Sequence, residues 1–274
     1  HRRRADHAGI DVSVLNGIRV IELGQLIAGP YAGMLLAAFG AEVIKVEAPS
    51  GDPIRAWRGI DGGTSLWWRS LSRNKRCIAV DLRRPAGRDL VRALIRESDV
   101  LIENFRPGTL ERWGLDPAAL READPKLIVA RVSGYGQTGP KRSEPGYASV
   151  CEAFGGLRHL TGEPGVAPVR ANLSLGDTLA GLHAALGVLL ALFHRERAGS
   201  GQQIDAAIYE AVFSVLESTL PEYDRLGVVR QASGASITGV VPTGTYPCKD
   251  GKRVVIGANG EAVFGRLCHA IGRA

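Results

Sequence analysis

Asp177 is the side chain in this sequence whose position most suggests chemistry. It stands in "NLSLGDTLAG" (172–181), directly ahead of a long apolar stretch with the pattern of a helix. A helix dipole favours negative charge at the helix N-terminus, so an aspartate there is kept ionised. An ionised carboxylate can act as the nucleophile in acyl transfer, and an aspartate at a helix start is also a common cap. The local sequence supports both interpretations.

Two clusters of basic and amide side chains lie next to predicted strands. "ENFRPGTLERWGL" (103–115) places Asn104, Arg106 and Arg112 around a Pro-Gly turn, and "SRNKR" (72–76) contains a second group. Guanidinium and amide groups at the carboxyl end of a strand suit a ligand rich in phosphate. A solvated loop explains the same composition, so both interpretations stay open here.

A glycine-rich turn, "SGYGQTGP" (133–140), follows another predicted strand. Glycines on both sides of an aromatic and an amide side chain allow the backbone to lie close to a ligand. The turn therefore supplies candidate site residues, although an ordinary tight turn has the same composition.

Short apolar runs alternate with helical patterns through the first part of the chain and would place these residues. We expect strands at 18–23, 42–47, 77–82, 99–104 and 126–132, and helices at 30–40, 85–98 and about 177–197. A strand and a helix follow within 202–217, and a strand, a Gly turn and a helix within 251–272. This alternation predicts an α/β fold with a parallel sheet. Ligands then bind at the carboxyl ends of the strands.

Dinucleotide binding is the first function that such a fold suggests, and the first turn argues against it. The turn "GQLIAGPYAG" carries Gly24, Gly29 and Gly33, whose spacing does not match G-x-G-x-x-G. Pro30 also lacks the N–H that would face a phosphate. We therefore do not expect a dehydrogenase with bound NAD.

Composition limits the partners and the compartment. The net charge is +6, but the basic residues are scattered among acids and no basic stretch carries interleaved aromatics, so we expect no nucleic acid partner. The four cysteines lie far apart, which predicts free thiols in the cytoplasm and no metal site. The apolar run Leu179–Phe193 is interrupted by Gly181, His183 and Gly187 and is expected to be a buried helix rather than a membrane span.

Several stretches together resemble the class III CoA-transferases, the CaiB/BaiF family. They are "GIRVIELGQLIAGPYAGMLLAAFGAEVIKVEAPSGDPIR", "NKRCIAVDLRRPAGRDLV", "DVLIENFRPGTLERWGL" and "SGYGQTGP", in this order. "SLGDTLAG" and "SGQQIDAAIYEA" continue the resemblance, which covers about residues 16–270. Each motif alone is weak, and the set is specific.

The resemblance implies a Rossmann-like large domain, a smaller second domain and two chains interlocked in a dimer. Coenzyme A is a substrate, and no other cofactor is implied. The family's catalytic aspartate falls on Asp177, which would carry the acyl group and then CoA as covalent intermediates. The residues implied for the CoA site are Ala28, Asn74, Lys75, Asn104, Arg106 and Arg112. The turn residues Gly134, Tyr135, Gly136 and Gln137 would form part of the active-site wall.

Departures from the family patterns narrow the choice of substrate. Formyl-CoA:oxalate members have Gln and Arg where Ile27 and Ala48 stand, so that activity is not expected. The related α-methylacyl-CoA racemases use a His-Asp pair where Tyr147 and Ala148 stand. Tyrosine, with a normal pKa of about 10, is a poor proton shuttle near neutral pH. A racemase-like enzyme is therefore the weaker alternative to CoA transfer, and a non-catalytic CoA-binding module is a second alternative.

"PVRANLSLGDTLAG" is similar to members that act on short dicarboxylates. Arg170 precedes Asp177 by seven residues and could pair with the distal carboxylate of such an acid, or it could be a surface arginine. We expect an acyl-CoA and a small, dicarboxylic acid as substrates.

The resemblance also predicts the domain limits. We expect a disordered leader over 1–15, a large CoA-binding domain over 16–220, and a linker with the start of the small domain over 221–274. Because family members are longer, we expect this sequence to stop within the small domain.

Overall fold

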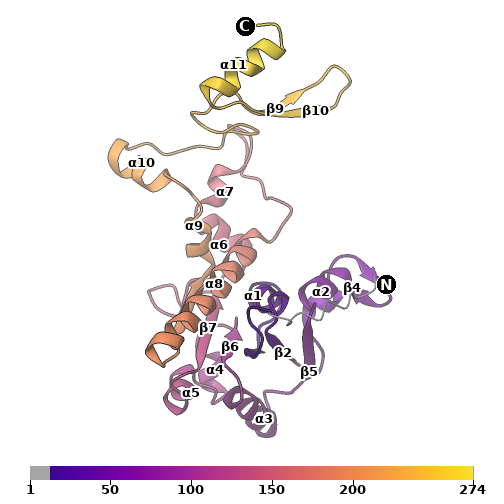
Figure 1. Ribbon diagram of the computed structural model, residues 1–274, viewed down its shortest axis with the longest axis vertical. Coiled ribbons are helices and arrows are strands. Elements are labelled where there is room, and N and C mark those ends of the chain that lie inside the picture. Colours follow the sequence, from indigo (N-terminus) through magenta and orange to yellow (C-terminus); the bar gives the residue numbers. More distant parts are fainter. Residues whose placement is uncertain (1–12, 274) are drawn as a thin grey trace. The chain divides into compact units, whose positions relative to one another are not determined.

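The computed structural model describes residues 13–273, which form two compact units (Figure 1). The first unit contains the described residues up to Cys151 together with Ser174–Val212, and the second contains Glu152–Leu173 and the described residues from Phe213 onward. Most of the predicted leader lies outside the described residues. Leu15 is nevertheless buried and donates its N–H to the Phe39 carbonyl at 3.0 Å, so the first unit already includes this residue.

A six-stranded sheet forms the centre of the first unit, in the order β5-β2-β1-β6-β7-β8. All neighbouring strands are parallel, which confirms the predicted α/β class. The strands are β1 (Arg19–Glu22), β2 (Glu42–Glu47), β5 (Lys75–Ala79), β6 (Val100–Glu103), β7 (Ile128–Ser133) and β8 (Gln203–Ala207). Their carboxyl ends share one edge of the sheet.

Helices cover both faces of this sheet, so the central strands are apolar on both sides. On one face, α1 (Ala28–Ala38) and α8 (Leu175–Ala198) pack on side chains such as Val20, Ile102 and Ala130. On the other, α3 (Pro85–Arg96), α4 (Thr109–Arg112) and α5 (Pro117–Ala123) pack on Leu101 and Val129.

The remaining elements of the first unit are short. They are η1 (Pro53–Ala56), β3 (Ile60–Asp61), β4 (Thr64–Ser65), α2 (Leu66–Leu71) and α9 (Ile208–Phe213). A further helix, α6 (Ala148–Phe154), begins in the first unit and ends in the second.

Helix α8 buries small residues and exposes large ones. Its buried positions are mostly alanine and glycine, whereas Leu182, Leu186, Leu189, Leu190 and Phe193 are 40–58% exposed. We call these five residues the outer face of α8. The helix is long and apolar enough to cross a membrane by length and composition, but core helices pass the same test and α8 packs on the sheet and α1.

The second unit contains α7 (Leu157–Leu160), α10 (Thr219–Leu226), an antiparallel hairpin of β9 (Thr243–Pro247) and β10 (Arg253–Gly257), and α11 (Glu261–Ala270). The predicted strand, Gly turn and helix at 251–272 correspond to β10 and α11. Arg230 links this unit internally through ion pairs with Glu217 and Glu222.

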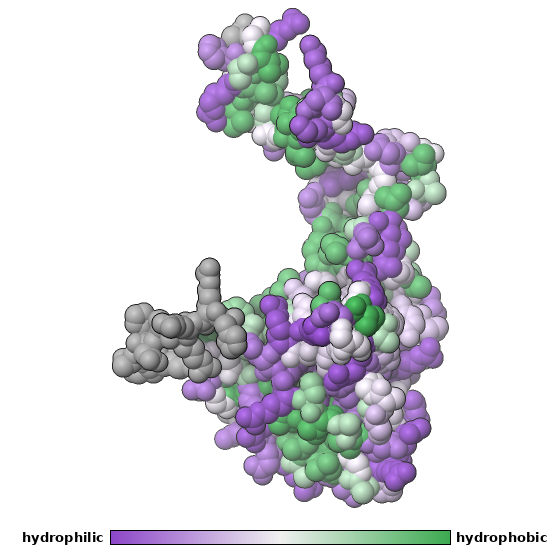
Figure 2. Space-filling view, turned by 90° about the vertical axis from the view of Figure 1, so that its right-hand side faces the viewer, coloured by the Kyte–Doolittle hydropathy of each residue, from purple (hydrophilic) through white to green (hydrophobic). Residues whose placement is uncertain are grey.

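The face shown in Figure 2 mixes apolar patches with hydrophilic side chains and has no single continuous hydrophilic field. Hydrophilic residues are thus spread over this face among apolar ones.

Candidate functional site

Asp177 lies in the first turn of α8 and is partly exposed. The N-cap residue is Ser174, and the Thr178 hydroxyl donates to its carbonyl oxygen at 2.9 Å. Asp177 is therefore inside the helix rather than at its cap position. The partial positive charge of the helix N-terminus acts directly on its carboxylate.

The face of α8 that carries Asp177 meets the start of α1. Gly181 is one turn further along α8, and residues four apart share a helix face. A Cβ at Gly181 would lie only 2.6 Å from the carbonyl oxygen of Ala28, the first residue of α1. The structure thus brings two predicted site residues, Asp177 and Ala28, to one helix crossing.

The loop that leads into α1, residues 23–27, is held by three side chains from other segments. Lys45 Nζ donates to the Gly24 carbonyl at 2.6 Å. Asn104 accepts from the Gln25 N–H at 2.7 Å and donates to the Gln25 carbonyl at 2.8 Å. Leu26 N–H lies 3.1 Å from each carboxylate oxygen of Asp52. The loop is therefore fixed at three successive residues.

Four buried charged side chains form a cluster of ion pairs next to this loop. Lys45 Nζ lies 3.0 Å from Glu22 and 3.0 Å from Asp52, and Lys75 Nζ lies 2.6 Å from Glu22. These side chains are at most 1% exposed, and two carboxylates balance two ammonium groups. Such a cluster is stable only when every charge is paired.

The two lysines respond differently to burial. Burial alone would lower the pKa of Lys45, but the Glu22 and Asp52 carboxylates outweigh it and raise that pKa. Burial lowers the pKa of Lys75, which Glu22 offsets only in part. Lys75 also donates to the Pro30 carbonyl at 2.7 Å, so its ammonium is directed into α1 and the cluster. The Lys75 side chain is fully buried, so direct contact of its ammonium with coenzyme A would require the surrounding groups to move.

The other basic and amide residues predicted for the CoA site lie on the surface. Arg106 and Arg112 are exposed after the carboxyl end of β6, and Arg112 donates to Thr109 Oγ1 at 3.0 Å. Asn74 is also exposed but immediately precedes β5, at the amino end of that strand. The arginines are thus near the edge where parallel sheets bind ligands, whereas Asn74 is at the other end of its strand.

The glycine-rich turn after β7 is shaped by contacts within the chain. A Cβ at Gly134 would lie 2.7 Å from the Gly146 carbonyl, and Gly136 has a φ of +83°. Gln137 N–H donates to Asp205 at 2.8 Å, and the Tyr135 ring lies 5.9 Å from the Tyr209 ring. The close approach at Gly134 and the positive φ at Gly136 both require glycine. Contacts within the chain are therefore enough to explain why this turn is rich in glycine, without a bound ligand.

Tyr147 and Arg170 are both exposed. Tyr147 is 74% exposed and the following Ala148 is 4% exposed. Arg170 is part of the second unit, where its Nε lies 3.9 Å from Glu152 Oε2. Arg158 Nε lies closer to the same oxygen, at 3.0 Å.

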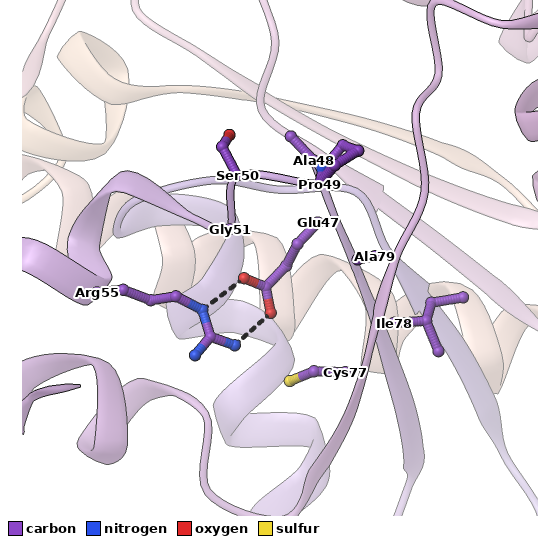
Figure 3. A pocket seen from close by; sticks show the side chains of 9 residues that line it. All are labelled: Glu47, Ala48, Pro49, Ser50, Gly51, Arg55, Cys77, Ile78 and Ala79. Carbon is purple, nitrogen blue, oxygen red and sulfur yellow. Dashed lines mark hydrogen bonds and ion pairs between the residues drawn. The ribbon is translucent and has the colours of Figure 1, made fainter. Parts of the chain in front are cut away.

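A hollow of about 260 Å³ opens at the carboxyl ends of β2 and β5 (Figure 3). The ion pair of Arg55 with Glu47, at 2.7 Å, lies within it beside Cys77. Arg55 also stacks on the Trp68 ring at 3.7 Å.

Burial alone would raise the pKa of Glu47 in this hollow, but the Arg55 guanidinium and the Asp52 N–H outweigh burial and lower that pKa. Burial raises the pKa of the Cys77 thiol, which keeps it protonated.

Comparisons with known proteins agree with this geometry. The family model described as CoA-transferase family III matches residues 15–274. The chain belongs to this family. It is 50% identical over 94% of its length to a succinyl-CoA–D-citramalate CoA-transferase of Chloroflexus aurantiacus, and 46% identical over 94% to a succinyl-CoA–L-malate CoA-transferase alpha subunit of that organism. The chain spans 65% and 61% of the lengths of these two relatives.

Solved structures of family III proteins confirm the fold. A CaiB/BaiF family protein from Brucella suis superposes with a TM-score of 0.86 at 36% identity, covering 94% of this chain and 70% of that one. The resemblance inferred from the motifs is therefore confirmed.

Two features of this family III chain were missed by sequence reasoning. The buried cluster of Glu22, Lys45, Asp52 and Lys75 was not predicted, although a lysine in the middle of the apolar strand "EVIKVE" was a signal for it. The hollow beside Glu47 was not predicted either. The signal for this hollow was Glu47, an acidic residue that ends the mostly buried strand β2 at the edge of the sheet where ligands bind.

Proposed function

We propose that the chain transfers CoA from an acyl-CoA donor to a small dicarboxylic acid, with Asp177 as covalent nucleophile. The position of Asp177 in the first turn of α8, at the crossing with α1, carries this proposal. The Chloroflexus relatives, named for succinyl-CoA with citramalate and malate, support the choice of dicarboxylates.

The reaction needs no net proton transfer. The Asp177 carboxylate attacks the thioester carbonyl, the C–S bond breaks, and a mixed anhydride and CoA thiolate form. The thiolate then attacks the Asp177 carbonyl carbon and displaces the donor acid, leaving Asp177 as a CoA thioester. The acceptor carboxylate attacks this thioester, the C–S bond breaks, and a second mixed anhydride forms with release of CoA thiolate. CoA thiolate then takes the acceptor acyl group and restores the Asp177 carboxylate.

Two physical effects assist these steps. CoA remains bound between the exchanges, so each attack by the thiolate is effectively intramolecular. Each addition places negative charge on a carbonyl oxygen, and backbone N–H groups at a helix N-terminus stabilise such charge. The first turn of α8 provides these groups next to the reacting carboxylate.

Arg170 is proposed to bind the distal carboxylate of the acceptor acid. Glu152 is bound more closely by Arg158 than by Arg170, at 3.0 Å against 3.9 Å. Loss of the longer contact leaves Glu152 paired, so the exposed Arg170 guanidinium can exchange partners at small cost. A guanidinium binds a carboxylate through two parallel hydrogen bonds.

The racemase alternative has less support in the structure. The two positions that would exchange the α-proton hold an exposed tyrosine, Tyr147, and a buried methyl group, Ala148. A methyl group cannot carry a proton, and neutral tyrosine is a weak base. CoA transfer is therefore the better assignment.

We further propose that the protein is a cytoplasmic homodimer. The outer face of α8 supports the dimer, because soluble monomers rarely expose a contiguous stripe of five large apolar side chains.

Covalent trapping tests the proposed function. The protein is incubated with succinyl-CoA, quenched with hydroxylamine, and digested for peptide mass spectrometry. An anhydride or thioester at Asp177 yields a hydroxamate at that residue, and Asp177→Asn serves as control. The proposal is wrong if CoA is exchanged without a trapped Asp177, or if the Asp177→Asn variant exchanges CoA at the wild-type rate.

α-Proton exchange with a 2-methylacyl-CoA, without CoA transfer, would support the racemase. CoA binding with neither reaction would support the non-catalytic module.

A further inference from the structure

Leu26 has a backbone conformation that its side chain disfavours. Its φ is +61°, in the left-handed region that only glycine and, less often, asparagine or aspartate adopt without strain. The residue lies between β1 and α1 and has no glycine neighbour on either side. Something outside the loop must therefore keep Leu26 in this conformation.

Asp52 is the side chain that binds the Leu26 backbone itself. Both of its carboxylate oxygens lie 3.1 Å from the Leu26 N–H, and one accepts from Ile54 N–H at 3.0 Å. Asp52 is itself held, because Lys45 Nζ lies 3.0 Å from its carboxylate and its own N–H donates to Glu47 at 2.8 Å. The Asp52 side chain is 1% exposed, so its carboxylate is shielded from bulk solvent.

The strained residue leads directly to the crossing of α1 and α8. Two residues after Leu26 comes Ala28, whose carbonyl oxygen is the atom closest to a Cβ placed on Gly181. Gly181 is one turn from Asp177 on the same helix face. A change in the conformation of Leu26 would therefore move the start of α1 against the helix that carries Asp177.

We propose that Asp52 is a positioning residue for the transfer site. By holding Leu26 in its left-handed conformation, Asp52 sets where the first turn of α1 lies against the N-terminal part of α8. This inference rests on the proposed function of Asp177. Asp52 itself exchanges no group with the substrates.

A compensating substitution tests this role. Asp52→Asn keeps the shape of the side chain but turns an amide NH₂ toward the donors around it, so the hold on Leu26 weakens. Leu26→Gly removes the steric penalty of a positive φ, so the loop no longer depends on Asp52. Leu26→Ala removes the same side-chain packing but retains the penalty, which makes it the matched control.

Steady-state kinetics are measured for each single variant and for the two double variants. We expect Asp52→Asn to lower kcat at least tenfold, because small displacements of reacting groups are costly. Leu26→Gly should restore most of kcat in the Asp52→Asn background, and Leu26→Ala should not. Equal kcat values for the two double variants, or an unchanged kcat for Asp52→Asn, would overturn the proposal.

Hydrogen exchange of the peptide that covers residues 23–28 separates this inference from the proposed function. We expect faster exchange in Asp52→Asn and a return toward the wild-type rate on adding Leu26→Gly. If the wild-type protein transfers no CoA, the proposed function fails while this measurement still decides whether Asp52 holds the loop. Unchanged exchange in Asp52→Asn would refute the positioning role even in an active enzyme.

Discussion

Ala28 and Gly181 lie so close that no side chain fits between the backbones of α1 and α8. A Cβ on Gly181 would be 2.6 Å from the Ala28 oxygen and 3.1 Å from the Tyr31 side chain. The first of these atoms is backbone at the start of a helix and cannot rotate away. This approach fixes where the first turn of α8, with Asp177, lies relative to the loop before α1.

Gly181→Ala should therefore separate the two helices. We expect a loss of about 1–3 kcal/mol in the free energy of unfolding from overpacking. We also expect kcat to fall by roughly 10²-fold, because the carboxylate of Asp177, the proposed nucleophile, is displaced. Chemical denaturation and steady-state kinetics measure the two effects.

Gly265→Ala is the matched control for that substitution. Gly265 is also inside a helix, but a Cβ there meets no atom within 4 Å. Alanine should stabilise α11 by up to about 1 kcal/mol and leave kcat unchanged. Equal effects of the two substitutions would show that the close approach of α1 and α8 is unimportant.

The ion pair of Glu47 and Arg55 should make stability depend on pH in acid. The pKa of Glu47 is lower in the folded protein than in the unfolded chain, because Arg55 and the Asp52 N–H stabilise its charged form. Its contribution is fully present above the unfolded pKa of about 4.3 and is lost as the pH falls through the folded pKa. Glu47→Gln should cost about 1–3 kcal/mol at pH 7, and the difference from wild type should shrink toward pH 3.

Denaturant titrations at several pH values between 3 and 7, as chosen test conditions, measure this difference. Glu122→Gln, at an exposed position on α5, provides the control and should stay close to wild type throughout. A Glu47→Gln deficit that is constant over this range would contradict the assignment.

Arg170 should decide between dicarboxylic and monocarboxylic acceptors. Arg170→Gln removes the charge, so we expect KM for succinate to rise roughly 10- to 100-fold, the worth of one charged hydrogen bond. KM for butyrate, which has no distal carboxylate, should stay the same. Acceptor kinetics with a common acyl-CoA donor measure both values.

Arg170→Lys keeps the charge without the two-pronged geometry and should give an intermediate KM for succinate. Equal losses for succinate and butyrate would show that Arg170 supports the fold rather than recognising the acid.

The sheet could be predicted from sequence because its signals are local. The predicted strand at 42–47 coincides with β2, and helix 85–98 differs from α3 by two residues at its end. Short elements were missed because they contain too few residues for a periodic pattern. Helix α2 has six residues, although Ser65 caps it, and β9 has five residues and is defined by its pairing with β10.

The candidate site was predictable only in part, for a similar reason. Asp177 was found through its motif, but the buried cluster depends on segments that meet only in the fold. Glu22 has room because position 33 is glycine, where a Cβ would overlap its carboxylate. Nothing in the sequence near Lys45 shows that Glu22 and Asp52 will surround it, so a buried cation was mistaken for an ordinary strand residue.

The outer face of α8 provides the test of the proposed dimer. Leu186 and Leu190 are one turn apart near its centre and are 52% and 58% exposed. Full burial of a leucine contributes roughly 1.5–3 kcal/mol, and because each of these side chains is already about half buried, a partner would add about half of that for each. Charge on this face cannot be buried without a partner, so Leu186→Glu with Leu190→Glu should convert a dimer to monomers in sedimentation velocity.

Leu90→Glu provides the comparison for this pair. Leu90 is 50% exposed on α3 and outside the outer face of α8, so its replacement should leave the sedimentation coefficient unchanged. A wild-type protein that sediments as a monomer, or a dimer that survives both α8 substitutions, would show that this face has another role. Because α8 also carries Asp177, loss of the dimer together with loss of CoA transfer would further indicate that association orders the site.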